Sequence, residues 1–220
     1  MQGKTHRVGG VLCALIGYTV LEANNMLIQD VNPLLQLTVM YPFAIYGSTV
    51  SDLDHNWNSA PSKDPISKGI NSVLHLTTGI RKNSGKSFPL LGIFDAKHRS
   101  WQTHSDIFLL VFMLLAFWLG TGGVSGVDGI IFRLIVLGFV FGLISHLILD
   151  AITPEGIWCL IPSIIQRKKV TFRLVPKSKF FATGGPWERL IRTLMWFAII
   201  LLFIYVIYKA SPYRFSFNFT

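Results

Sequence analysis

Apolar residues are grouped into five long stretches, at about residues 8–28, 34–51, 107–125, 129–149 and 191–208. Each approaches the length of about 20 mostly apolar residues that a helix needs to cross a bilayer. Two long polar segments, 52–106 and 150–190, alternate with short turns at 30–33 and 120–129. The pattern predicts an all-α fold, a polytopic membrane helix bundle of about five transmembrane helices.

The first stretch has a second interpretation, because it follows two basic residues, Lys4 and Arg7. A basic start before an apolar run is also typical of a secretory signal peptide. The best cleavage candidate, Leu21-Glu22-Ala23, lacks the small residues that a signal peptidase prefers. We therefore expect this stretch to be a retained helix.

Composition and charge support a membrane location and predict an orientation. Only 14% of the residues are charged, against about 25% in soluble domains, and the mean hydropathy is +0.49. Lys and Arg number 20 against 11 Asp and Glu, and 17 of these 20 lie before the first stretch, in segment 52–106 or within residues 150–192. Because basic loops remain cytoplasmic, we expect a multi-pass protein of the inner (cytoplasmic) membrane with a cytoplasmic N-terminus.

These expectations define one membrane-embedded domain over residues 1–212, with cytoplasmic loops at 52–106 and 150–190 and a C-terminal tail at 213–220. Within the second loop, segment 167–182 alternates basic and apolar residues, which predicts a short basic hairpin or surface ribbon. It is either a solvated loop or a contact with anionic lipid head groups. The expected partner is the lipid bilayer, and no nucleic acid is expected.

Candidate metal ligands gather at the helix ends that the charge pattern places in the cytoplasm. The two cysteines, Cys13 and Cys159, form no CxxC motif, so any metal site must use imidazole and carboxylate. Four predicted helix ends carry such side chains, and we therefore expect a metal cluster at the cytoplasmic helix ends. The candidate ligands are His6, Asp52, Asp54, His55, His98, His104, His146 and Asp150.

The spacing of small residues indicates that His6, and the pair His146 and Asp150, face other helices. His146 and Asp150 are four residues apart and share a helix face, and Gly138 and Gly142 extend the same stripe. Small residues four apart are typical of the faces by which membrane helices approach closely. A similar stripe, His6, Gly10, Ala14 and Gly17, runs along the first helix.

Each motif alone also has a structural interpretation. His146 could be an interfacial histidine that is hydrogen-bonded to a helix-ending Asp150, and the run 52–55 could be a polar helix terminus. Acidic groups are disfavoured near a helix C-terminus unless a cation compensates them. The run 98–106 could mark the membrane interface, and His75 is expected to be a packing or surface residue rather than a ligand.

Imidazole together with carboxylate suits zinc, and also manganese or iron. The candidates are too many for one tetrahedral zinc ion, so we expect two or three divalent ions, which could activate a bridging water and clamp a phosphoester. Asp52 or Asp54 could orient the attacking water, and Arg99 could neutralise a phosphate oxygen. The sequence thus predicts that the domain 1–212 is a metal-dependent hydrolase. We expect it to be a phosphoesterase with a phosphoester or phospholipid substrate.

Four motifs, in order, carry a resemblance to a known family. They are Thr5-His6, Ser51-Asp-Leu-Asp-His55, His98-Arg99 through Thr103-His104-Ser105, and Ser145-His-Leu-Ile-Leu-Asp150 through Gly156. In this combination the chain resembles the YdjM-type membrane-bound metal-dependent hydrolases over residues 5 to about 190. That family is grouped with zinc-dependent phospholipase C and single-strand-specific zinc nucleases, which implies an all-α fold with a multi-zinc phosphoesterase centre. The candidates that the resemblance carries over are His6, Asp52, Asp54, His98, His104, His146 and Asp150.

The resemblance departs from the family pattern at one point and leaves two questions open. The family's spacing in the third motif is one residue shorter than that from His98 to His104, which leaves His98 open as a ligand. The run 183–188 resembles a Gly-rich element of the family, but we expect it to start a helix, with Pro186 first and Glu188 in the first turn.

The alternative to an enzyme is a membrane metal-binding protein, whether transporter, sensor or scaffold.

Overall fold

The computed structural model describes residues 3–27, 31–50, 106–120, 126–153, 156–159, 170–174 and 184–210. Within these ranges the chain forms five α-helices and one two-stranded antiparallel sheet. The elements are α1 (Gly3–Ala23), α2 (Pro33–Val50), α4 (Asp106–Gly120), α5 (Gly126–Ala151), β1 (Ile157–Trp158), β2 (Thr171–Phe172) and α7 (Pro186–Ala210). The predicted all-α fold is confirmed.

Helix ends follow local sequence signals more closely than hydropathy. The helix α2 starts with Pro33 in its first position, and the side chain of Asn32 accepts the Leu34 N–H at 2.8 Å as an N-cap. Beyond α1, Asn25 has a φ of 54°, a left-handed conformation that asparagine tolerates and that stops a helix. These signals are local, so they act whatever the rest of the chain does.

The observed bounds correct several of the predicted stretches. The first helix begins at Gly3 and not near residue 8, because the helix continues through Lys4 and Arg7, whose side chains are exposed. The third helix ends at Gly120, short of 125, whereas the fourth covers Gly126–Ala151. The last helix begins at Pro186 with Glu188 in its first turn, as predicted.

Among the described residues, two helices are long and apolar enough to cross a membrane, namely the segment Asp128–Ala151 of α5 and the whole of α7. A shorter apolar segment, Leu109–Leu119, lies in α4. The number of about five spans stays a prediction.

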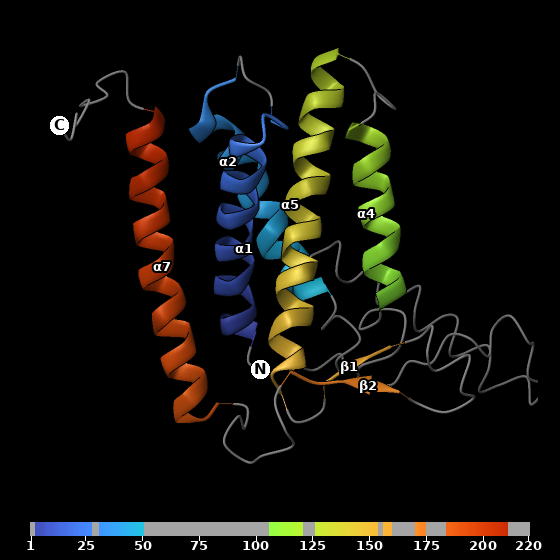
Figure 1. Ribbon diagram of the computed structural model, residues 1–220, viewed down its shortest axis with the longest axis vertical. Coiled ribbons are helices and arrows are strands. Elements are labelled where there is room, and N and C mark those ends of the chain that lie inside the picture. The colour runs from blue at the N-terminus through green and yellow to red at the C-terminus, as the bar shows by residue number, and fades with distance from the viewer. Residues whose placement is uncertain are drawn as a thin grey trace, which may run out of the picture.

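The helices lie side by side in an up-and-down arrangement (Figure 1). The central helix α1 contacts α2, α5 and α7, and α4 packs mainly on α5 at the side away from α7. The first turns of α1 and α7 and the last turns of α5 lie at the same end of the bundle, beside the β1–β2 sheet. This end carries the described candidate ligands.

Glycines allow α2 and α5 to touch along their backbones. A Cβ atom on Gly138 would collide with the carbonyl oxygen of Met40, and one on Gly142 would collide with that of Ala44. The two glycines and the two carbonyls are each four residues apart, so the contact repeats once per turn. The predicted stripe on α5 therefore faces protein, and α2 and α5 form the most extensive contact between described elements.

The helix α1 is held equally closely. A Cβ atom on Gly9 would lie 2.7 Å from the Ser145 hydroxyl of α5, and one on Gly10 would lie 2.6 Å from the Ala44 carbonyl oxygen of α2. Such contacts admit no side chain larger than hydrogen. The α1 and α2 backbones therefore meet one turn away from His6, and at the same level α1 lies against side chains of α5.

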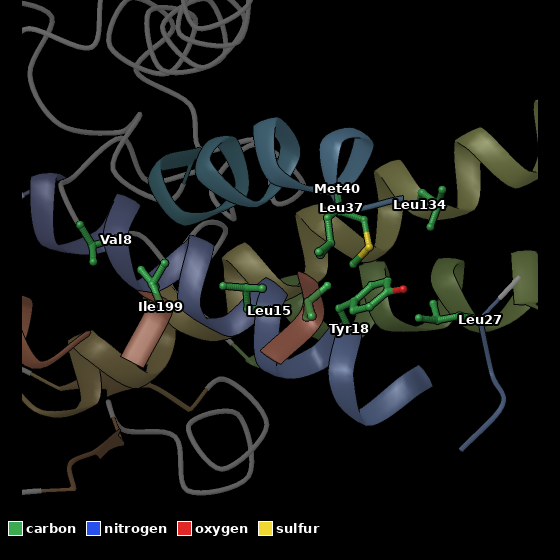
Figure 2. Packing of buried hydrophobic residues seen from close by; sticks show 9 residues of the cluster. Val8, Leu15, Tyr18, Leu27, Leu37, Met40, Leu134 and Ile199 are labelled. Carbon is green, nitrogen blue, oxygen red and sulfur yellow. The ribbon is translucent and has the colours of Figure 1, made fainter. Parts of the chain in front are cut away.

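A buried apolar cluster connects the rest of α1 to its neighbours (Figure 2). Leu15 and Tyr18 of α1 are no more than 1% exposed and belong to the same cluster as Leu37 and Met40 of α2. The remaining buried members are Val8, Leu27, Leu134, Ile199 and Val206. The cluster includes residues of α5 and α7, so it sets how all four helices pack.

The small sheet follows α5 directly. Ile157 pairs with Phe172 across the two strands, and the backbone N–H of Leu174 donates to the Ala151 carbonyl at 2.9 Å. Gly156 has a φ of 70°, and a Cβ there would collide with the Phe172 carbonyl. A strand therefore exists within the predicted ribbon 167–182, although its partner lies upstream at 157–158 and the rest of that segment is outside the described residues.

We expect Gly142→Ala to lower the free energy of unfolding by about 1–3 kcal/mol, the usual cost of overpacking, because the added methyl group collides with backbone. Unfolding of the detergent-solubilised protein by added SDS measures this. The matched control is Gly3→Ala, where a Cβ meets nothing within 4 Å. Equal stability of the two variants would contradict the close contact of α2 and α5.

Candidate metal centre

Three predicted ligands that are distant in sequence meet at one end of the bundle. His6 lies in the first turn of α1, and His146 and Asp150 lie in the last two turns of α5. Their ligand atoms all lie within 4.8 Å of one another. The exposed fractions are 1% for His6, 0% for His146 and 1% for Asp150, so the group is closed off from solvent.

The carboxylate of Asp150 lies against both imidazoles. His6 Nε2 is 3.6 Å from Asp150 Oδ1, and His146 Nε2 is 3.4 Å from Asp150 Oδ2. The two rings are stacked, with centroids 4.1 Å apart and planes inclined by 22°. Each ring therefore directs one nitrogen at a different oxygen of the same carboxylate.

A backbone carbonyl sets the orientation of the His146 ring. His146 Nδ1 lies 2.7 Å from the carbonyl oxygen of Ser48 in α2. A carbonyl can only accept, so Nδ1 donates the hydrogen, and in the neutral ring Nε2 offers its lone pair toward Asp150. Histidines that bind metals almost always donate their other N–H in this way, which orients the ring and fixes the tautomer.

The donor set fits one metal ion. Two imidazole nitrogens and one carboxylate oxygen are the ligands of known catalytic zinc sites, which leave a fourth position for water or substrate. Ligand arms of about 2.1 Å in a tetrahedron place two donors about 3.4 Å apart, close to the two nitrogen–oxygen separations observed. His6, His146 and Asp150 can therefore bind one ion, although neither its identity nor the total number of ions follows from this geometry.

A cation next to Asp150 would offset the unfavourable position of its carboxylate. Asp150 is the penultimate residue of α5, where the partial negative charge of the helix C-terminus opposes another negative group. Burying an ionised carboxylate is costly unless a positive charge or hydrogen bonds compensate it. Thr153 completes this end, because its hydroxyl donates to the Asp150 carbonyl oxygen at 2.7 Å.

A second buried carboxylate, Glu188, attaches α7 beside the site. Glu188 is 3% exposed and accepts a hydrogen bond of 2.6 Å from the Thr5 hydroxyl and another of 2.6 Å from the Gly184 N–H. The second bond resembles the reach-back of a capping box. Glu188 thus starts α7, as predicted, and also connects it to the residue before His6.

The other predicted site residues lie outside the described residues, and their roles stay predictions. They are Asp52, Asp54, His55, His98, Arg99 and His104. The structure adds Ser48, which sequence reasoning missed because a backbone carbonyl has no side-chain signature. Thr5 belongs to the first of the four motifs, next to His6. Its hydrogen bond to Glu188 could not be predicted from the sequence, because the two residues are 183 positions apart.

We expect Thr5→Val to lower the free energy of unfolding by about 1–3 kcal/mol, because the buried Glu188 carboxylate loses a donor. SDS titration of the detergent-solubilised protein measures this. The matched control on the same helix is Thr19→Val, whose exposed hydroxyl bonds only the Ile16 carbonyl and which should change stability by less than about 0.5 kcal/mol. Equal losses in the two variants would show that the Thr5–Glu188 bond contributes nothing specific.

Comparison with known proteins gives a family for this arrangement. The sequence model described as YdjM inner membrane protein matches residues 1–213. No curated protein and no solved structure matches the chain. The family match, together with the two apolar helices that are long enough to span a bilayer, supports a membrane location. Because the match covers nearly the whole chain, the protein belongs to the YdjM inner membrane protein family.

Proposed function

We propose that this protein is a membrane-bound, metal-dependent phosphoesterase that acts at the cytoplasmic membrane face. The observation that carries the proposal is the buried group of two imidazoles and one carboxylate, His6, His146 and Asp150, with ligand atoms within 4.8 Å of one another. Hydrolytic metal centres are commonly built from this donor set.

The three side chains would hold the ion in different ways. Asp150 supplies the negative charge, and both histidines supply neutral nitrogen donors. The Ser48 carbonyl holds the His146 ring in one tautomer, so the ring need not reorient when an ion binds. A divalent ion bound there supplies Lewis acidity, which polarises a phosphoester oxygen and makes water a stronger acid.

The remaining roles in this proposal rest on the sequence. Asp52 or Asp54 orients the attacking water, and Arg99 neutralises charge on a phosphate oxygen. A second or third ion would need further donors, for which His55, His98 and His104 are the candidates, together with the two aspartates. Zinc is the first choice of metal, since His and carboxylate ligands suit it, and manganese and iron are the alternatives.

The location of the site favours a substrate at the membrane surface. His6 and Asp150 lie at helix ends, and Asp150 closes a segment that is long and apolar enough to span a bilayer. The excess of basic residues in the predicted loops supports a cytoplasmic location for this end by the positive-inside rule. A phosphoester at that depth is found in phospholipid head groups, and we propose phospholipid as the substrate class.

The burial of the group favours a second candidate function. A site whose three described donors are at most 1% exposed is also suited to a permanently bound ion that joins α1 to α5. In that case the protein is a membrane metal-binding protein without hydrolytic activity. A transporter is less favoured, because ligand-type residues would then line a path through the bilayer, and the predicted ligands gather at one end.

We expect the purified protein to contain at least one divalent ion per chain and His146→Ala to lose both this ion and phosphoester hydrolysis. Elemental analysis of protein purified without chelator measures the metal. Release of phosphate products from phospholipids and nucleotide esters measures the activity. The matched control is His75→Ala, because His75 is expected to be a packing or surface residue rather than a ligand, and it should retain both properties.

The outcomes separate the two functions. Metal that is lost in His146→Ala together with hydrolysis supports the phosphoesterase. Metal that is lost without any hydrolysis in the wild type supports the metal-binding protein. Hydrolysis that persists in His146→Ala contradicts the assignment of this residue.

A further inference from the structure

We propose that a pocket between α4, the last turns of α5 and the β1–β2 sheet binds one acyl chain of an anionic phospholipid. The inference deepens the proposed function, and it rests on that function only for the role of this lipid as substrate. The pocket itself is a feature of the described structure and can be tested without any assay of hydrolysis.

The pocket is apolar on every described wall. It has a volume of about 400 Å³, within the range of about 300–1,000 Å³ that is usual for small-molecule sites. The α4 wall includes Leu110 and Met113, the α5 wall Ile144 and Ile148, and the sheet side Phe172 and Leu174. None of these side chains can donate or accept a hydrogen bond, so a water molecule in the pocket would find no polar partner on these walls. A hydrocarbon chain needs no such partner and matches the apolar walls.

The pocket lies next to the candidate metal centre. Its lining includes Leu147 and Ala151, which directly follow His146 and Asp150 in α5. Because consecutive helix residues are about 100° apart, the same two turns present the metal-ligand candidates on one face and the pocket wall on a neighbouring face. A lipid that is held in this pocket has its polar end at the end of the bundle where the ligand candidates lie.

The charge beside the pocket favours an anionic head group. Arg173 stands between the lining residues Phe172 and Leu174 and is exposed. Its aliphatic stem lies against Gly156, where an added Cβ would be 2.7 Å from Arg173 Cγ. A guanidinium at a membrane interface pairs with lipid phosphate oxygens. The apolar walls match the acyl chains of an anionic phospholipid, and an exposed cation next in sequence to two wall residues matches its charge.

The surroundings also favour lipid over a protein segment. The α5 wall belongs to Asp128–Ala151, a candidate membrane span, and the α4 wall belongs to the apolar segment Leu109–Leu119. At that depth the surrounding medium is hydrocarbon, so acyl chains are already present at high concentration.

Native mass spectrometry of the detergent-solubilised protein with dioleoylphosphatidylglycerol or dioleoylphosphatidylcholine tests the inference. We expect the wild type to retain one lipid at collision energies that remove the others, with phosphatidylglycerol preferred. Ile148→Trp and Leu110→Trp, which fill the pocket from its two helical walls, should each reduce this retained fraction at least tenfold. Arg173→Gln should retain a lipid but lose the preference for phosphatidylglycerol.

The matched control is Leu201→Trp, which places the same bulk on an α7 residue that is 68% exposed and should leave the retained lipid unchanged. The far-UV circular dichroism spectrum and the elution volume in size-exclusion chromatography are measured for every variant to confirm that the bundle is folded. The inference is overturned if the two pocket variants retain as much lipid as Leu201→Trp, because the bound lipid would then be annular. An unchanged preference in Arg173→Gln would overturn the role of Arg173.

The same samples keep this inference separate from the proposed function. His146→Ala should lose metal and still retain the lipid. A wild type that retains the lipid but hydrolyses no phosphoester contradicts the phosphoesterase and leaves the pocket standing. A wild type that hydrolyses phosphoesters but retains no lipid contradicts the pocket alone.

Discussion

The close approach of the α2 backbone to the backbones of α1 and α5 is the constraint on which the rest of the structure depends. Where Gly10 and Gly142 meet the Ala44 carbonyl, no side chain separates the helices. One turn further along α2 and α5, this spacing leaves the Ser48 carbonyl 2.7 Å from His146 Nδ1. If the backbones were a side chain's width apart, the carbonyl could not reach the ring, and the His146 tautomer would not be set.

Two buried carboxylates lie at this end of the bundle, and the protein accommodates them differently. Glu188 accepts hydrogen bonds from Thr5 and from the Gly184 N–H, donors of the kind that satisfy a helix start. Asp150 faces two imidazole nitrogens at distances longer than ordinary N–H···O hydrogen bonds. Glu188 therefore has the surroundings of a structural residue, whereas Asp150 belongs to a group that could bind a metal ion.

The helix α5 organises the chemistry because its faces have different neighbours. Gly138 and Gly142 contact α2, and the same stripe continues to His146 and Asp150. A neighbouring face lines the apolar pocket with α4 and the sheet. The hydrogen bond from the Leu174 N–H to the Ala151 carbonyl keeps the sheet against the end of α5. Lipid binding and metal binding, as proposed, would therefore share one rigid element.

The sequence by itself determined the helices, the inward stripe of small residues on α5 and the shared face of His146 and Asp150, because apolar runs and i,i+4 spacing act within one element. It misplaced helix ends by up to five residues, since exposed Lys4 and Arg7 are compatible with a helix that hydropathy does not detect. Only the tertiary structure decided that His6 stacks on His146 and that the Ser48 carbonyl sets the ring. These contacts join residues about 100 or more positions apart, and they depend on distances between helices that no local pattern encodes.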